Sequence, residues 1–317
     1  MEDLGGLIMK NAVVTGANGF VGAALCYELV KNDVEVYAVC RNEASNLSRL
    51  VQSPKLHVVF CAQDQYKKLP ELISDGVDTF YHFAWEGSSG SIRGNSEVQL
   101  ENVRCSCEAV RFSKLLGCNK FIFASSIMEY EIQNAIKTEA KIGINTIYSS
   151  AKVAASYMCQ AIANDLDIGY CCGIISNIYG PGETSPRLVN SVIRKLICDQ
   201  HCSFSSGIQL YDFIYIDDAV RAFYMIGEKG KNNRRYYIGS KPKPLKNYLL
   251  EIRDVINPES ELGFGELPQP VTVLNYDEFN VNLLYQDSGF KAEIPFKEGI
   301  LRTVNWIKGE ENRHGQG

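Results

Sequence analysis

The chain has 317 residues, 45% of them hydrophobic and 22% charged, with a formal net charge of −5 at pH 7. That length suits one large domain with a smaller lobe, and an acidic balance without a Lys/Arg run argues against nucleic acid as a partner. No apolar stretch has membrane-spanning length and the start lacks a secretory pattern, so we expect no membrane association and a cytoplasmic location. The eleven cysteines lack metal-ligand spacing. We therefore expect reduced thiols and no metal site.

A glycine-containing turn near the N-terminus is the most informative stretch. The apolar run 12–14 leads into Gly16, Gly19 and Gly22, and residues 20–29 have the apolar spacing of a helix. A strand, turn and helix in this order direct free backbone N–H groups and the positive end of a helix dipole at one point, which suits a pyrophosphate. A packing unit without a ligand is the alternative reading of the glycines. The cofactor contacts predicted here are Gly16, Asn18, Gly19, Phe20, Val21 and Gly22.

The strand expected at 34–39 is followed by Cys40-Arg41-Asn42. NAD sites usually have an acidic residue here that binds the ribose 2′-hydroxyl, whereas an arginine pairs with a 2′-phosphate. Arg41 therefore favours NADP(H), with NAD(H) as the second choice and a solvated surface arginine as the structural alternative. A third strand is expected at 57–60, and Asp64 follows it near the expected adenine pocket.

Strands and helices continue to alternate along the next segment. Strands are expected at 79–84 and 120–124, and residues 96–117 between them have helical spacing. Such alternation predicts right-handed crossovers and an α/β fold with a doubly wound parallel sheet. The residue that ends the first of these strands, Ala84, is expected to contact the cofactor.

Ligands of such sheets bind beyond the carboxyl ends of the strands. Gly16, Arg41, Trp85 and Ser126 all follow expected strands directly. Their convergence at one edge is a stronger indication of a site than any of them alone. His82 lies inside an apolar run, so we expect it in the core rather than in catalysis.

Tyr148 and Lys152 lie four residues apart at the start of a helix expected to run to about residue 164. Residues at this spacing project from the same helix face. A nearby ammonium favours the phenolate and lowers the pKa of a tyrosine, which suits proton transfer. Ser126 would hydrogen-bond the same substrate oxygen. A tyrosine and a lysine at this spacing often occur by chance. Here they predict a proton-transfer site because the glycine turn and the strand that ends at Ser126 precede them.

A Gly/Pro cluster, Gly180-Pro181-Gly182, predicts the entry to a second lobe. The expected dinucleotide domain covers 9–180, with 211–240 returning to it, and the substrate lobe covers 181–210 and 241–317. The remaining expected elements are strands at 170–175, 210–216 and 236–238, helices at 187–198, 248–256 and 297–307, and a helix through residues 220–226 capped by Asp217-Asp218.

Four motifs in this order make the chain resemble the extended short-chain dehydrogenase/reductases, which include sugar-nucleotide epimerases, dehydratases and 4-ketoreductases. The motifs are residues 15–22, Ser125-Ser126, Tyr148 with Lys152, and residues 177–182. The resemblance covers nearly the whole chain. It implies an enzyme with a Rossmann-type domain, an NAD(P) cofactor, a nucleotide-sugar substrate and a small C-terminal substrate lobe.

The resemblance also implies roles for single residues. The three glycines would hold the pyrophosphate, Tyr148 would be the acid/base, and Lys152 would be its partner and would hold the nicotinamide ribose. Ser126 matches the serine of the family's Ser-Ser motif. Asn102 matches a commonly found asparagine, and Asn177 matches one that binds substrate near its phosphates. Relatives commonly dimerise through the helices expected at 96–117 and 148–164, so a homodimer is implied; packing of both helices on the sheet alone is the alternative.

Two departures from the family pattern narrow the activity. Dehydratases carry Asp-Glu after the catalytic Ser/Thr, where this chain has Ile127-Met128, and Met128 also cannot replace the cysteine of 3,5-epimerising relatives. Redox at one carbinol carbon remains, and Arg41 favours reduction with NADPH. The sequence thus predicts a 4-ketoreductase of a nucleotide-linked sugar; an NAD-dependent 4-epimerase and a non-catalytic dinucleotide-binding regulatory protein are the alternatives.

The substrate lobe departs from the family as well. Tyr211 stands where relatives have an arginine that contacts the substrate diphosphate, and Leu267-Pro268-Gln269 lies where a second such arginine is usual. Arg187 or Arg194 would have to compensate. The substrate contacts predicted for the whole chain are Trp85, Ser126, Asn177, Arg187 and Tyr211.

Overall fold

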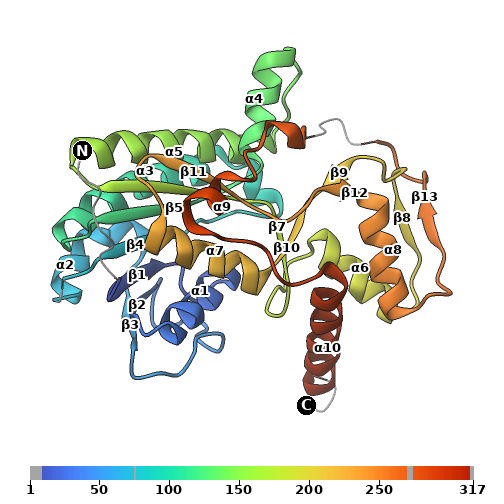
Figure 1. The fold of residues 1–317 in the computed structure, drawn as a ribbon, viewed down its shortest axis with the longest axis horizontal. Coiled ribbons are helices and arrows are strands. Elements are labelled where there is room, and N and C mark those ends of the chain that lie inside the picture. Colours follow the sequence, from blue (N-terminus) through green and yellow to red (C-terminus); the bar gives the residue numbers. More distant parts are fainter. Residues whose placement is uncertain (1–8, 75, 270–273, 315–317) are drawn as a thin grey trace. The chain divides into compact units, whose positions relative to one another are not determined.

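The computed structural model describes residues 9–74, 76–269 and 274–314, which form two compact units (Figure 1). The first unit contains the chain up to Ile175 together with Val220–Ile238 and Asn280–Phe290. The second contains Ser176–Ala219, Gly239–Phe279 and the chain from Lys291 onward. These units differ from the expected domains in the assignment of residues 176–180, 211–219, 239–240 and 280–290. That one domain binds the dinucleotide and the other the substrate stays a prediction.

A seven-stranded parallel sheet forms the centre of the first unit, in the order β11-β6-β5-β4-β1-β2-β3. Its strands are β1 (Asn11–Thr15), β2 (Glu35–Cys40), β3 (Leu56–Phe60), β4 (Thr79–His82), β5 (Lys120–Ser126), β6 (Gly169–Ile175) and β11 (Arg234–Ile238). The order reverses between β1 and β4, and the crevice at such a reversal is where ligands of these sheets bind. The predicted doubly wound parallel sheet is confirmed.

Helices with an apolar stripe cover both faces of this sheet. The helices of the first unit are α1 (Phe20–Lys31), α2 (Leu69–Leu72), α3 (Ser96–Leu115), α4 (Glu129–Thr138), α5 (Thr146–Asp165), α9 (Leu283–Ser288) and the part of α7 (Ile216–Lys229) from Val220 on, with 3-10 turns η1 (Gln63–Lys68) and η2 (Ser91–Gly94). Of these, α4 contacts α5 and projects away from the sheet (Figure 1). Figure 1 shows α3 and α5 along one face and α1 and α7 at the other. On α1, Leu25 and Leu29 are buried, as their spacing predicts. Helix α4 was not predicted.

The second unit consists of three strand pairs with helices. The pairs are β7 (Asn177–Tyr179) with β10 (Phe213–Tyr215), β9 (Leu210–Tyr211) with β12 (Lys243–Pro244), and β8 (Cys202–Phe204) with β13 (Leu262–Phe264); the helices are α6 (Leu188–Ile197), α8 (Leu245–Ile256), α10 (Phe296–His314) and the turn η3 (Tyr276–Glu278). The single strand expected over 210–216 is wrong, because the chain breaks at Asp212. The carboxylate of Asp212 accepts the backbone N–H of Ser240 at 2.9 Å, which turns this residue out of the ladder.

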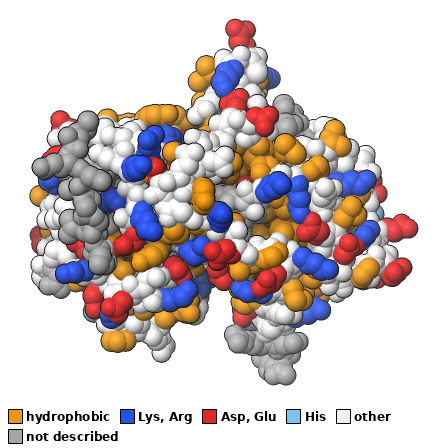
Figure 2. Space-filling model, in the orientation of Figure 1, with side chains coloured by type: hydrophobic (Ala, Val, Ile, Leu, Met, Phe, Trp, Pro, Cys, Tyr) orange, Lys and Arg blue, Asp and Glu red, His pale blue; other side chains and the backbone are white. Residues whose placement is uncertain are grey.

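Side chains of both charges are spread over the surface. On the face drawn in Figure 2, Lys and Arg mix with Asp and Glu over the residues that are described. In the described part of the chain, no helix combines the length and the apolar character needed to cross a membrane. All eleven cysteines are free thiols; ten are buried, and Cys198 after α6 is exposed.

Candidate active site

The turn between β1 and α1 has the close packing that its glycines predict. Gly16 has a φ of +65°, which glycine adopts readily, and a Cβ there would lie 2.9 Å from the backbone N of Ala84. A Cβ on Gly22 would lie 2.2 Å from the carbonyl oxygen of Gly16. Helix α1 begins after Gly19, and among the described residues no side chain caps it there. Its first N–H groups are thus available to an anion.

Thr15 and His82 join the ends of β1 and β4 under this turn. The Thr15 hydroxyl oxygen accepts the backbone N–H groups of Phe83 at 3.1 Å and Ala84 at 3.2 Å. The imidazole of His82 lies 2.9 Å from that oxygen through Nδ1 and 3.0 Å from Ser106 Oγ through Nε2. Burial, and next the charge of Lys152, lower the pKa of His82 to about 3. His82 is therefore a neutral core group, as its apolar surroundings in the sequence predict.

Two buried amides of α3 fix the loop after β4. Asn102 accepts the N–H of Glu86 at 3.0 Å and donates to its carbonyl at 2.8 Å. Gln99 accepts the indole N–H of Trp85 at 2.9 Å and donates to the carbonyl of Gly87 at 3.1 Å. In this structure Asn102 positions the loop, and its contact with a cofactor stays a prediction. Gln99 was not predicted, although it lies three residues before Asn102 on the same helix face.

Arg41 follows β2 and lies beside an acidic residue that the sequence did not single out. Its guanidinium is 3.4 Å from the carboxylate of Glu86, and both side chains are well exposed. Such a pair contributes little to stability and opens readily for a ligand. Of the other predicted cofactor contacts, Asn18 donates its amide to the carbonyl of Asn46 at 3.2 Å, and Asp64 lies in η1.

Lys152 is buried against β5 and an aromatic ring. Its Nζ donates to the carbonyl oxygen of Ala124 at 2.9 Å and lies 3.7 Å from the centroid of the Trp85 ring, a cation–π contact. Burial lowers the pKa of Lys152 to about 7, and the negative charge of Glu129 partly opposes this change. The ammonium is thus held in place on two sides.

Tyr148 lies one helical turn before Lys152 and is also buried. The rings of Tyr148 and Trp85 form a T-shaped pair with their centroids 6.1 Å apart, and the Arg93 guanidinium stacks 4.7 Å from the Tyr148 ring centroid. Ser126 ends β5, and its hydroxyl oxygen accepts the N–H of Met128 at 3.2 Å. The structure thus gathers Tyr148, Lys152 and Trp85, with Ser126 two residues beyond the carbonyl that binds Lys152. Their catalytic roles stay predictions, and Arg93 had no signal in the sequence.

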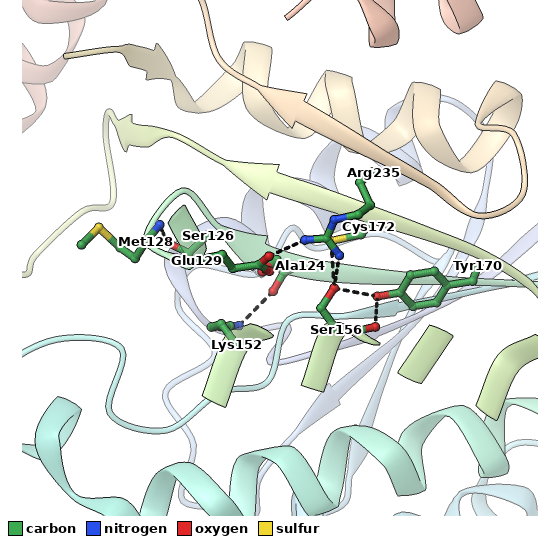
Figure 3. Close-up of polar contacts among 10 residues, drawn as sticks. Ala124, Ser126, Met128, Glu129, Lys152, Ser156, Tyr170, Cys172 and Arg235 are labelled. Carbon is green, nitrogen blue, oxygen red and sulfur yellow. Dashed lines mark hydrogen bonds and ion pairs between the residues drawn. The ribbon is translucent and has the colours of Figure 1, made fainter. Parts of the chain in front are cut away.

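The residues after Ser126 offer no acid/base group at the two positions where dehydratases carry Asp-Glu. Ile127 is buried, and Met128 is half-buried. The next residue, Glu129, is fully buried and binds Arg235 and Ser125 (Figure 3). A carboxylate whose two oxygens are both bound in this way is not available for elimination chemistry.

The second unit contains the other predicted substrate residues. Asn177 donates its amide to the carbonyl of Asp212 at 2.9 Å, and Arg187 precedes α6 with its guanidinium 3.5 Å from Glu183. Tyr211 stacks on Phe213, with the ring centroids 5.7 Å apart. It also lines a largely apolar cavity of about 320 Å³, whose other walls include Leu188, Lys195, Phe204, Gln209 and Leu267. Asn177 and Arg187 are not among the described residues that line this cavity.

Among the described residues, no group of three or more His, Cys, Asp or Glu side chains is placed to hold a metal ion.

Comparison with known proteins identifies the family. Residues 12–239 match the model of the NAD dependent epimerase/dehydratase family, which is more than half of the chain. The chain belongs to this family. It is therefore an enzyme of the extended short-chain dehydrogenase/reductase type with an NAD-binding Rossmann fold, as the motifs predict.

Two curated relatives align over almost their whole length. CDP-abequose synthase of Salmonella typhimurium is 26% identical, over 92% of this chain and 97% of that protein. Human dTDP-D-glucose 4,6-dehydratase is 24% identical, over 98% of this chain and 93% of that protein. The relatives thus include different reactions, and their names do not single out one for this chain.

Solved structures show the same fold. Bordetella bronchiseptica WbmF, solved with NADH, has a TM-score of 0.79 at 18% identity and covers 98% of this chain and 95% of its own. A UDP-N-acetylglucosamine 4-epimerase of Methanobrevibacter ruminantium, solved with UDP-N-acetylmuramic acid, has a TM-score of 0.78 at 20% identity, covering 96% and 100%. At these identities the likeness concerns the fold.

Proposed function

We propose that this enzyme is an NADPH-dependent 4-ketoreductase of a nucleotide-linked sugar. One observation carries the proposal: Tyr148 and Lys152 are buried together against Trp85, next to Ser126, while Ile127 and Met128 offer no acid or base. This set can move one proton at one oxygen and lacks the second pair of groups that elimination of water needs.

The glycine turn fits a dinucleotide. A Cβ at Gly16 or Gly22 would clash with backbone atoms, so the turn has room for glycine at both positions and not for a larger residue. The start of α1 has no side-chain cap and suits a pyrophosphate. When bound, the dinucleotide would supply the hydride. We propose that Gly16, Gly19 and Gly22 hold its phosphates and that Lys152 holds its nicotinamide ribose.

The protein's part of the reduction is to hold the carbonyl and deliver a proton. Tyr148 would donate its phenolic proton to the carbonyl oxygen, and Ser126 would donate a hydrogen bond to the same oxygen. The Lys152 ammonium lies one helical turn away, where its positive charge stabilises the phenolate that Tyr148 becomes. Trp85 covers Lys152 and limits the access of water to it.

A 4-epimerase with NAD is the second candidate, and Glu86 is the observation that favours it. This carboxylate lies beside Arg41, where it would repel a 2′-phosphate and could accept a ribose hydroxyl. An epimerase oxidises and re-reduces the same carbon, so the same Tyr148, Lys152 and Ser126 would serve it.

Denaturing the purified enzyme and identifying any released nucleotide separates the two candidates. Near-stoichiometric NAD(H) would indicate a retained cofactor and an epimerase. Protein that is free of nucleotide and binds NADPH more tightly than NADH supports the ketoreductase, and consumption of NADPH with 4-keto nucleotide sugars completes the test. If the protein turns over no keto sugar in either direction, both enzymatic candidates are rejected and a non-catalytic dinucleotide-binding regulatory protein remains.

Replacing Arg41 by Ala tests the choice of cofactor. A charge-assisted hydrogen bond is worth about 1.5–3 kcal/mol, so the Kd for NADPH should rise about 10-fold to 150-fold while the Kd for NADH stays the same. Fluorescence titration of each cofactor measures both constants. In the matched variant Glu86→Gln, which removes the competing carboxylate, NADPH should bind more tightly. Equal loss of both cofactors in Arg41→Ala would contradict a role at the 2′-phosphate.

We also propose that the nucleotide of the substrate occupies the cavity lined by Tyr211 in the second unit. Its volume of about 320 Å³ and its apolar walls suit a base, and Lys195 supplies a positive charge at its lining. The tyrosine that replaces the usual arginine would then contact the ligand through its ring. This assignment makes the substrate a nucleoside diphosphate sugar, as in the relatives' names.

A homodimer through α3 and α5 is proposed as well. These helices pack together, yet Leu100 and Leu115 on α3 and Tyr157 and Met158 on α5 expose 49–68% of their surface. Exposed apolar side chains on two adjacent helices suit a second copy of the same pair. Sedimentation at micromolar concentration should give twice the monomer mass of 35.4 kDa. A monomer at that concentration would reject the interface.

A further inference from the structure

A buried carboxylate and a half-buried guanidinium lie close to Lys152. Glu129 begins α4, and none of its surface is exposed. The Ser125 hydroxyl donates to one of its oxygens, and the Arg235 guanidinium donates to the other and also to the Ser156 hydroxyl. Figure 3 shows this group between β5, β11 and α5, beside the Lys152 side chain.

Two thiols and an imidazole near Lys152 are uncharged at neutral pH. Burial raises the pKa of Cys172 on β6 to about 11, and it raises the pKa of Cys159 on α5 well above its ordinary value. His82 on β4 is neutral, since burial lowers its pKa. Glu129 is the group whose negative charge acts most strongly on Lys152. A buried ammonium needs a compensating anion, and in this set the carboxylate supplies it.

Arg235 explains how a fully buried carboxyl can supply a charge. Burial raises the pKa of Glu129, which favours the neutral acid. The charge of Arg235, the hydrogen bond from Ser125 and the charge of Lys152 act in the opposite direction and limit this rise. Arg235 in turn keeps its charge because a guanidinium does not deprotonate in proteins.

We propose that Glu129 is the counter-anion of Lys152: bound by Arg235 and Ser125, it favours the ammonium form of Lys152 and thereby positions that ammonium for the proton transfer of Tyr148. Glu129 has no exposed surface, so we assign it and its partner Arg235 as positioning residues that act through Lys152. The effect of Glu129 on the charge of Lys152 is a property of the chain itself, and only its use in catalysis rests on the proposed function.

The test is a direct titration of Lys152 by NMR in protein carrying 13C at lysine Cε. The Lys152 signal is assigned by its absence in Lys152→Arg. In Glu129→Gln the amide keeps the shape of the side chain but not its charge, so the pKa of Lys152 should fall by one unit or more, a tenfold loss of proton affinity. An unchanged pKa in this variant would overturn the proposal, whatever the enzyme's activity.

Two further variants keep the test decisive. Asp287→Asn is the matched control, because Asp287 is another buried carboxylate near β11, paired with Lys231 and Arg234; it should leave the pKa of Lys152 unchanged. If Glu129→Gln alone fails to fold, the double variant Glu129→Gln/Arg235→Met removes the whole pair, a change that buried pairs often tolerate. The pKa of Lys152 should fall in the double variant too, and no fall there would equally reject the proposal.

Activity then separates this inference from the proposed reaction. In the oxidative direction Tyr148 must be a phenolate, so loss of the Lys152 charge should move the rising limb of the kcat–pH profile of Glu129→Gln to higher pH by about one unit. A lowered Lys152 pKa in an enzyme that turns over no sugar would uphold the counter-anion and reject the proposed function. A lowered Lys152 pKa with an unmoved pH profile would reject the catalytic use of the charge.

Discussion

Replacing Tyr148 by Phe should lower kcat by a factor of about 10² to 10⁴, the usual contribution of a positioned acid or base. The phenyl ring keeps the packing against Trp85 and Arg93, which both contact the Tyr148 ring. Affinity for the dinucleotide should therefore change little. Steady-state turnover of a 4-keto sugar, together with cofactor titration, measures both quantities.

The matched control for this variant is Tyr157→Phe. Tyr157 lies on the same helix, α5, and about half of its surface is exposed, so loss of its hydroxyl should leave kcat unchanged. Turnover of Tyr148→Phe within a few-fold of the unmodified enzyme would show that another group transfers the proton. A parallel loss of cofactor binding would point instead to a disturbed helix.

Replacing Arg235 by Met should cost about 3–5 kcal/mol of unfolding free energy at neutral pH, because the variant leaves Glu129 buried without its partner. The double variant Glu129→Gln/Arg235→Met should recover much of this loss, since neither charge is then stranded. Urea unfolding of Arg235→Met, Glu129→Gln and the double variant gives the coupling free energy of the pair. A loss in the double variant equal to the sum of the two single losses would mean that the pair contributes no coupling.

The loss in Arg235→Met should also depend on pH in one direction. Burial raises the pKa of Glu129 above its unfolded value, and removal of Arg235 raises it further. A carboxyl with a raised folded pKa stabilises the fold below the unfolded pKa, about 4.3, and this contribution disappears as the pH rises through the folded pKa. The deficit of the variant should thus be largest at neutral pH and shrink towards pH 4. A deficit that grows on acidification would contradict a stranded carboxylate.

Local patterns were sufficient to predict most of the first unit. The glycine turn depends on contacts within residues 15–22, and Tyr148 and Lys152 share a face because a helix repeats every 3.6 residues. Parallel strands buried on both faces appear as short apolar runs, which is why β4 and β6 were recognisable. These features need no knowledge of distant contacts.

The features that were missed depend on residues far apart in the chain. Glu129 and Arg235 are separated by 106 positions, so neither one indicates its partner in the sequence. The break at Asp212 depends on the backbone of Ser240, 28 positions away. Glu86 beside Arg41 was missed for the same reason, and it is the contact that bears most directly on the choice between NAD and NADP.

The eleven thiols have a practical consequence. Cys198 is exposed in the folded chain and the other ten are buried, so a water-soluble thiol reagent meets one reactive position on the native protein and eleven on the unfolded one. Counting labelled cysteines by mass over time therefore reports how often each region opens, without any engineered probe. A dye attached at Cys198 would also place a single optical reporter at the end of α6, the helix that helps to line the Tyr211 cavity.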